Sequence, residues 1–147
     1  MTESKKIKVA ISHGDINGIG YEVILKTFSD ARMFEHCTPI LYGSSKVASY
    51  HKKLLPQLQQ EFVFTGIQSA EQAQDKKFNV INLTQDEIKI EIGKSTETAG
   101  LLSRMALDRA CEDIMNGNAD VLVTAPINKK NIQSPDFDFP GHTEYLS

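Results

Sequence analysis

The residues best suited to chemistry lie first in SHGDINGIGYE, which spans positions 12–22 and follows the apolar run 7–11. Glycines between a strand and a helix often cradle a phosphate, but this spacing matches neither the P-loop nor the GxGxxG of dinucleotide sites. A plain turn, in which Gly18 and Gly20 allow close helix–strand packing, explains the pattern equally well. Asp15 offers a carboxylate for a ligand, or else an N-cap for the following helix.

Two further polar stretches lie near the C-terminal end of the sequence. Lys129 follows the apolar run 120–124, and FPGHTEY at 139–145 contains His142 and Thr143. A histidine titrates near neutral pH and can donate or accept a hydrogen bond, which suits a substrate contact. Taken alone, Lys129 is equally typical of a solvated surface lysine, and His142 of a structural residue beside a helix start.

The elements that must position these residues alternate between short apolar and longer amphipathic runs. We expect strands at 7–11, 39–42, 62–64, 79–83, 88–92 and 120–124, and helices at 18–28, from Ser44 or Ser45 to about 55, and at 95–116. The period-two alternation of 88–92 predicts a strand with one wet face, whereas 120–124 is predicted to be buried. The pattern indicates a layered α/β fold with a largely parallel sheet, flanking helices and no internal domain boundary.

In such sheets ligands bind beyond the carboxyl ends of the strands. Asp15 and Lys129 both follow predicted strands, so we expect them to share a cleft suited to a small, hydroxylated anion. Gly18 and Gly20 are expected beside them.

The composition limits the classes of partner. The 147 residues carry a net charge of −3 and are 40% hydrophobic, without a basic stripe or a membrane-spanning run, so neither nucleic acid nor a membrane is an expected partner. No signal peptide is apparent, and Cys37 and Cys111 are far apart, which favours reduced thiols and a cytoplasmic location. The four histidines lack metal-ligand spacing, so we expect no metal site and no certain catalytic residue within this chain alone.

Taken together, GDINGIGYE, GKSTETAGLLSRMALDRA, VTAPINK and FPGHTEYL resemble the family of 4-hydroxythreonine-4-phosphate dehydrogenase, the NAD-dependent enzyme of pyridoxal phosphate biosynthesis. The first motif of that family commonly reads GDPAGIGPE, whereas Ile16, Asn17 and Tyr21 replace its prolines and alanine here. The loop frame is kept, but we expect a less stiff loop because the fixed φ of proline is absent.

The resemblance implies a fold like that of isocitrate and isopropylmalate dehydrogenases, with two α/β domains around a cleft, of which 1–147 would be an incomplete N-terminal portion. It implies oxidation and decarboxylation of 4-phosphooxy-L-threonine with NAD and a divalent metal (zinc, magnesium or cobalt), in a homodimer. His142 and Thr143 would contact substrate, while the metal ligands would lie beyond Ser147. The 12–22 loop would then form the floor of a substrate cleft rather than a nucleotide phosphate loop.

Two alternatives stay open. A related enzyme with the same frame could oxidise a phosphorylated sugar acid, such as threonate or erythronate phosphate. The chain could also be a binding or dimerising fragment without turnover.

Overall fold

Five parallel strands form one sheet in the computed structural model, which describes residues 6–55, 63–84, 88 and 90–125. Their order is β3-β4-β2-β1-β5, and every neighbouring pair is parallel. The bounds are Ile7–Ser12 for β1, Cys37–Gly43 for β2, Phe64–Ile67 for β3, Phe78–Asn82 for β4 and Val121–Thr124 for β5. The parallel α/β sheet expected from the sequence is therefore confirmed.

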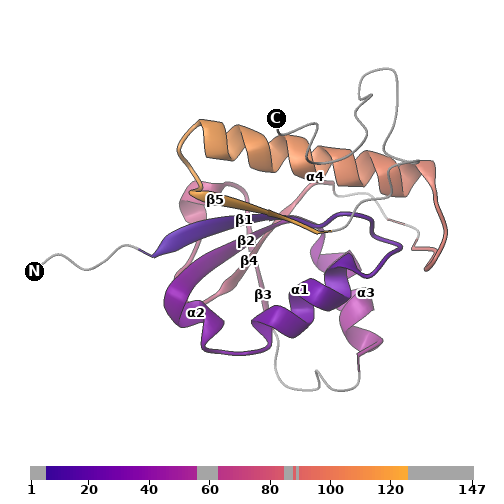
Figure 1. Ribbon diagram of the computed structural model, residues 1–147, viewed down its shortest axis with the longest axis horizontal. Coiled ribbons are helices and arrows are strands. Elements are labelled where there is room, and N and C mark those ends of the chain that lie inside the picture. Colours follow the sequence, from indigo (N-terminus) through magenta and orange to yellow (C-terminus); the bar gives the residue numbers. More distant parts are fainter. Residues whose placement is uncertain (1–5, 56–62, 85–87, 89, 126–147) are drawn as a thin grey trace, which may run out of the picture.

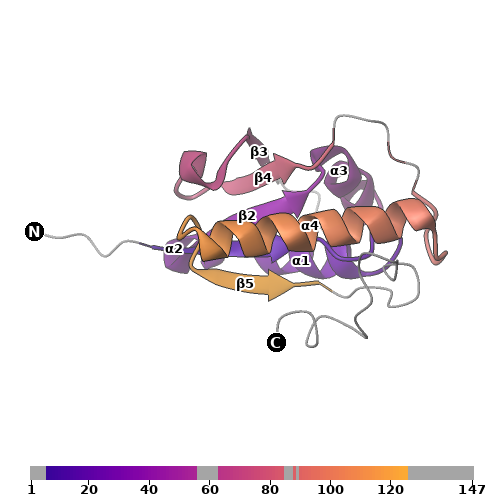
Figure 2. The same ribbon diagram turned by 90° about the horizontal axis from the view of Figure 1, so that it is seen from above.

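Helices cover both faces of this sheet. α1 (Gly20–Phe28), α2 (Met33–His36) and α3 (Ser45–Lys53) lie on one face, and α4 (Glu97–Met115) runs across the other (Figures 1 and 2). A short 3-10 helix, η2 (Ala70–Gln72), connects β3 to β4. The sequence patterns did not predict α2 or η2, since one turn is too short to show a helical period.

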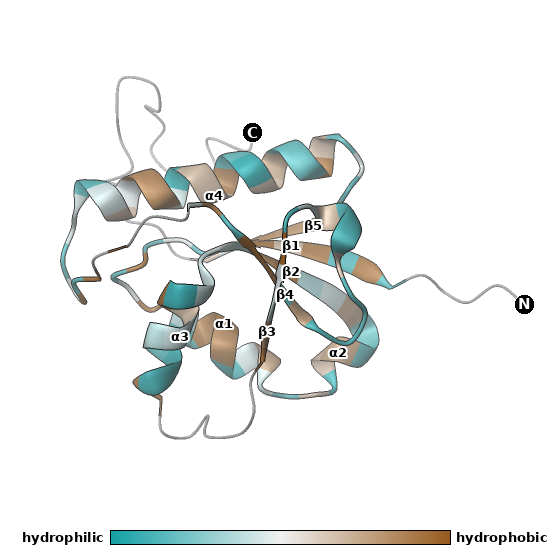
Figure 3. Ribbon diagram, turned by 180° about the vertical axis from the view of Figure 1, so that it is seen from behind, coloured by the Kyte–Doolittle hydropathy of each residue, from teal (hydrophilic) through white to brown (hydrophobic). Residues whose placement is uncertain are grey.

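Buried apolar residues form clusters between the sheet and the helices, and parts of the strand ribbons carry the brown of hydrophobic residues in Figure 3. Along β1, Ala10 packs in a cluster with Ala106 and Ala110 of α4, and the next residue, Ile11, packs in a second cluster with Phe28 of α1. A strand that is buried on both faces reads as a continuous apolar run, which is why 7–11 was recognisable.

Side chains cap the starts of α3 and α4, and a glycine follows the end of α4. The Thr96 hydroxyl accepts from the Ala99 amide (3.1 Å) at the start of α4, and Ser44 accepts from the Val47 amide (3.3 Å) at the start of α3. After α4, Gly117 takes a φ of 78°, a left-handed conformation typical of a glycine that ends a helix.

The strand predicted at 88–92 is wrong for the residues described there, which belong to no strand. Ile88 and Ile90 pack against the core, which explains the alternation. The Glu91 amide, however, donates to Oδ1 of Asn17 (2.7 Å), so this segment is bonded to the loop after β1 instead of to a sheet.

The strand predicted at 120–124 exists as β5, but its expected full burial is wrong. β5 pairs with β1 at an edge of the described sheet, and Leu122 packs in the α4-side cluster. Val121 and Val123 alternate with Leu122 along the strand, and their side chains remain 45% and 47% exposed.

Candidate functional site

The loops that follow β1 and β5 leave the sheet side by side. Ser12 and Thr124 are register partners at the carboxyl ends of these parallel strands, and the Ala125 amide donates to the Ser12 carbonyl (3.1 Å). This confirms that the 12–22 loop and the segment after Thr124 begin at one edge, where α/β proteins bind ligands. Lys129, His142 and Thr143 lie outside the described residues, so their place in this site remains a prediction.

Asp15 shapes the first of these loops. Its Oδ1 accepts from the Asn17 amide (3.0 Å), and its carbonyl accepts from the Gly18 amide (3.0 Å), which closes a tight turn. It does not cap the helix, because the N-cap of α1 is Ile19, which makes no side-chain cap bond. Oδ2 of this half-buried carboxylate has no hydrogen-bond partner among the described residues, and is the oxygen left for a ligand.

The two glycines at the end of the loop have different roles. A Cβ on Gly20 would lie 2.8 Å from the His13 carbonyl oxygen and 3.1 Å from Cβ of Ala125, so only glycine lets α1 approach the ends of β1 and β5 so closely. A Cβ on Gly18 would meet nothing closer than 3.5 Å. Close helix–strand packing thus explains Gly20 but not Gly18.

Beneath the loop, a buried chain of hydrogen bonds ties β1, α1, β2 and α4 together. Nε2 of His13 lies 3.0 Å from the Leu102 carbonyl, which can only accept, so this nitrogen carries the proton. Nδ1 must then accept from the Tyr21 hydroxyl (2.6 Å), which itself accepts from the Ser44 amide (3.1 Å). The hydrogen bonds thus run in one direction: the Ser44 amide donates to Tyr21, Tyr21 donates to His13, and His13 donates to the Leu102 carbonyl.

Burial sets the ionisation of this network. It lowers the pKa of His13 from 6.5 to about 4 and raises the pKa of Tyr21, so both side chains are neutral near pH 7. His51 stacks on the Tyr21 ring with 5.2 Å between centroids and donates from Nε2 to the Ile16 carbonyl (2.7 Å). Burial lowers its pKa as well. These residues therefore serve to hold the loop.

Asn17 anchors the loop from its other side. Its side-chain Nδ2 donates to the Lys94 carbonyl (3.1 Å) and to the Thr96 hydroxyl (3.3 Å), while its backbone carbonyl accepts from the Gly93 amide (2.8 Å). Asn17 and Tyr21 occupy two of the positions where the sequence departs from GDPAGIGPE. The expectation of a less stiff loop stays a prediction, although hydrogen bonds of Asn17 and Tyr21 hold the loop to its surroundings.

A small hollow of about 270 Å³ lies outside this loop. Its wall includes Ile19, Leu54 and Ile92, which are 62%, 53% and 51% exposed. These apolar side chains offer no donors to a phosphorylated substrate, so we do not assign the substrate to this hollow.

A metal ion needs several ligating side chains close together. Within residues 6–55, 63–84, 88 and 90–125, no three His, Cys, Asp or Glu side chains cluster as a metal site would require. No GxGxxG element for a dinucleotide occurs in the sequence. None of the helices in these ranges has both the length and the apolar composition needed to cross a bilayer.

Sequence reasoning missed the network formed by His13, Tyr21 and His51, because it weighed the histidines only as metal ligands. A signal was present for His51, which follows buried Val47 and Ala48 on α3 at the spacing of one helix face. Nothing in the sequence indicated that Tyr21 would bond both His13 and Ser44.

Comparison with known proteins agrees with the motif analysis. The model of the family "Pyridoxal phosphate biosynthetic protein PdxA" matches residues 35–147. A 4-hydroxythreonine-4-phosphate dehydrogenase of Bacteroides thetaiotaomicron is 53% identical over 98% of this chain and 39% of its own length. A Clostridium botulinum protein, named provisionally as a D-threonate 4-phosphate dehydrogenase, is 30% identical over 100% of this chain and 44% of its own.

A solved structure shares the fold. The crystal structure of a 4-hydroxythreonine-4-phosphate dehydrogenase from Burkholderia phymatum superposes with a TM-score of 0.86 at 26% identity, covering 97% of this chain and 43% of that one. This agrees with the isocitrate- and isopropylmalate-dehydrogenase-like fold implied by the resemblance. The chain spans about two fifths of the length of the relatives it matches.

Proposed function

The chain belongs to the family of the pyridoxal phosphate biosynthetic protein PdxA, and on that premise we propose that it is part of an NAD-dependent dehydrogenase of 4-phosphooxy-L-threonine. The enzyme oxidises the secondary alcohol of this substrate and releases carbon dioxide. The observation that carries the proposal is the 53% identity, over nearly the whole chain, to a protein named for that activity.

Within this enzyme, the chain forms one wall of the substrate cleft. The free Oδ2 of Asp15 lies at the carboxyl edge of the sheet, where it accepts a hydrogen bond from a hydroxyl or ammonium group of the substrate. We place Lys129 beside it for the anionic end, and His142 and Thr143 in direct contact with substrate. Gly18 and Gly20 shape the floor, and the hydrogen bonds of Asn17 and Tyr21 keep that floor in place before substrate arrives.

We place NAD and the divalent metal (zinc, magnesium or cobalt) on the part of the relatives' length that this chain does not span. When bound, these groups supply the hydride acceptor and the Lewis acid that oxidation of an alcohol needs. A homodimer and a cytoplasmic location complete the proposal, and the free thiols of Cys37 and Cys111 suit a reducing compartment.

A second candidate is oxidation of a phosphorylated sugar acid. It is favoured by the name of the Clostridium botulinum relative, which is 30% identical over the whole chain. The two substrates differ where one carries an ammonium group and the other a hydroxyl.

The test measures NADH absorbance when the native polypeptide that contains this sequence receives NAD, magnesium or zinc, and either 4-phosphooxy-L-threonine or D-threonate 4-phosphate. We expect faster turnover of the first substrate, and preference for the second would favour the alternative. Absence of NADH with both would support a binding or dimerising protein.

The role of Asp15 is tested by Asp15→Asn. This change keeps the Oδ1 acceptor of the turn, but it removes the charge and replaces Oδ2, the acceptor assigned to substrate, with an NH₂ donor. We expect the stability to change by less than about 0.5 kcal/mol while kcat/KM falls roughly tenfold or more, as for a lost charged hydrogen bond. An unchanged kcat/KM would reduce Asp15 to a turn residue.

A further inference from the structure

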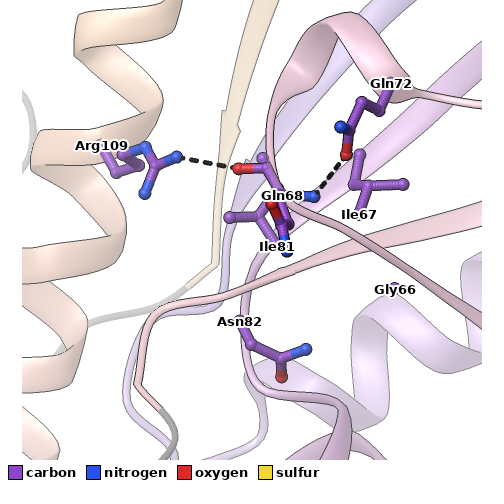
Figure 4. A pocket seen from close by; sticks show the side chains of 7 residues that line it. All are labelled: Gly66, Ile67, Gln68, Gln72, Ile81, Asn82 and Arg109. Atoms are coloured by element: carbon purple, nitrogen blue, oxygen red, sulfur yellow. Dashed lines mark hydrogen bonds between the residues drawn. The ribbon is translucent and has the colours of Figure 1, made fainter.

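A second cleft opens at the carboxyl ends of β3 and β4, beneath α4 (Figure 4). Its volume is about 690 Å³, within the usual range for small-molecule sites. The cleft lies at the same carboxyl edge of the sheet as the site described above, but β2 separates β4 from β1 and β5, so the two places are apart along that edge. It is lined by Gly66, Ile67, Gln68, Gln72, Ile81, Asn82 and Arg109.

Two side-chain amides in this cleft have their orientation fixed by backbone donors. Oδ1 of Asn82 accepts from the Ser45 amide (2.8 Å), and Oε1 of Gln72 accepts from the Gln68 amide (2.8 Å). Because a backbone N–H can only donate, the oxygen of each side chain must face it, and each NH₂ group is left over. Neither NH₂ group has a hydrogen-bond partner within the described ranges.

Arg109 provides the only positive charge among the lining residues. It extends from α4 toward the loop after β3, where Nη2 donates to the Gln68 carbonyl (3.2 Å) (Figure 4). This bond positions the guanidinium of the partly buried Arg109 and leaves most of its five N–H donors without a partner among the described residues. Among the described residues, no carboxylate forms an ion pair with Arg109.

The unused groups of Asn82, Gln72 and Arg109 are thus donors, while the side-chain amide of Gln68 can turn its NH₂ group toward a ligand as well. One positive charge and the apolar side chains of Ile67 and Ile81 lie beside them. A planar guanidinium matches a carboxylate in two parallel hydrogen bonds. One guanidinium balances one negative charge, whereas a phosphate dianion would keep a second charge uncompensated. We propose that this cleft binds a small monocarboxylate through Arg109, with the Asn82 and Gln72 NH₂ groups as further donors.

The experiment is an NMR titration of the native, ¹⁵N-labelled polypeptide with acetate, following the side-chain signals of Asn82, Gln72 and Arg109. Acetamide is the neutral, isosteric control, inorganic phosphate tests the other oxyanion, and sodium chloride matches the ionic strength. We expect saturable shifts with acetate, none with acetamide and weaker ones with phosphate.

Two variants and one matched control assign the effect to the cleft. Arg109→Gln should weaken acetate binding about tenfold or more, as loss of a charged hydrogen-bond donor does. Gln72→Glu keeps the acceptor for the Gln68 amide but places a negative charge in the cleft, so it should abolish binding even if Arg109→Gln perturbs α4. Arg32→Gln is the matched control, because it removes the same charge from an 82% exposed side chain at the start of α2, across the sheet from α4. It should leave acetate binding unchanged.

Three results would overturn the proposal. They are the absence of saturable shifts with acetate, equal binding of acetate by Gln72→Glu, and tighter binding of phosphate than of acetate. The outcome does not depend on dehydrogenase activity, because the readout is binding alone.

Discussion

Removing the hydroxyl of Tyr21 is expected to destabilise the chain more than any other single-atom change in the loop region. In Tyr21→Phe the ring still fills its fully buried site and still stacks on His51, so packing changes little. The Ser44 amide and Nδ1 of His13 both lose their partner in a place that water does not reach. Each buried polar group left unpaired costs about 1–3 kcal/mol, so for the two groups we expect a loss of roughly 2–6 kcal/mol in the free energy of unfolding.

The assay is urea-induced unfolding, followed by far-UV circular dichroism because the chain has no tryptophan. The matched control is Tyr50→Phe, which deletes the same atom from a 41% exposed side chain whose hydroxyl has no hydrogen-bond partner within the described ranges. Its effect should stay below about 0.5 kcal/mol.

A loss below about 1 kcal/mol for Tyr21→Phe, or equal losses for both variants, would refute the relay from Ser44 through Tyr21 to His13. It would mean that water or a rearranged side chain satisfies the two orphaned groups.

Three further predictions follow from the same region. Gly20→Ala should lower the free energy of unfolding by about 1–3 kcal/mol, because the new Cβ would meet the His13 carbonyl. Gly18→Ala should change it by less than about 0.5 kcal/mol, and equal urea midpoints for the two variants would contradict this contrast. The free energy of unfolding should fall by about 3 kcal/mol as the pH drops from 6.5 to 4, because His13 takes up a proton in the unfolded chain over this range, whereas burial lowers its pKa to about 4 in the folded chain. Urea titrations at several pH values measure this, and a free energy of unfolding that does not change with pH would contradict it. Ser103→Ala on α4 should leave the free energy of unfolding unchanged or raise it by roughly 0.5 kcal/mol, since the described residues give this buried hydroxyl no partner and alanine favours a helix. A clearly lower melting temperature would show that the hydroxyl makes a contact.

The fold was predictable wherever one local rule decided the outcome. The apolar run of β1, the start of α3 at Ser44 or Ser45 and the end of α4 near residue 116 each follow from neighbours within a few residues. The run 88–92 misled because alternation reports which side chains are buried and not where the backbone amides bond. There, Asn17 supplies an acceptor from 74 residues away in the sequence.

The position of the candidate site was predictable, but the packing and hydrogen bonds that hold its loop were not. Two parallel strands with polar residues at their carboxyl ends must present them at one edge, and β1 and β5 do so. The sequence does not say which residues meet in space. The contact of Gly20 with the ends of β1 and β5, and the hydrogen bonds of Asn17 and Tyr21, could therefore not be predicted. The burial of β5 was overestimated because apolar composition cannot tell a central strand from an edge strand.

In the proposed enzyme, this chain contacts the substrate and the metal ligands lie outside it. The most direct test of this claim is His142→Ala in the native polypeptide. Bound metal, measured by atomic emission, and steady-state NADH formation should be determined on the same preparation. The account predicts unchanged metal content and a fall in kcat/KM of about tenfold or more, the effect of removing a polar contact to a charged substrate. Loss of metal together with activity would contradict it, because His142 would then be a metal ligand.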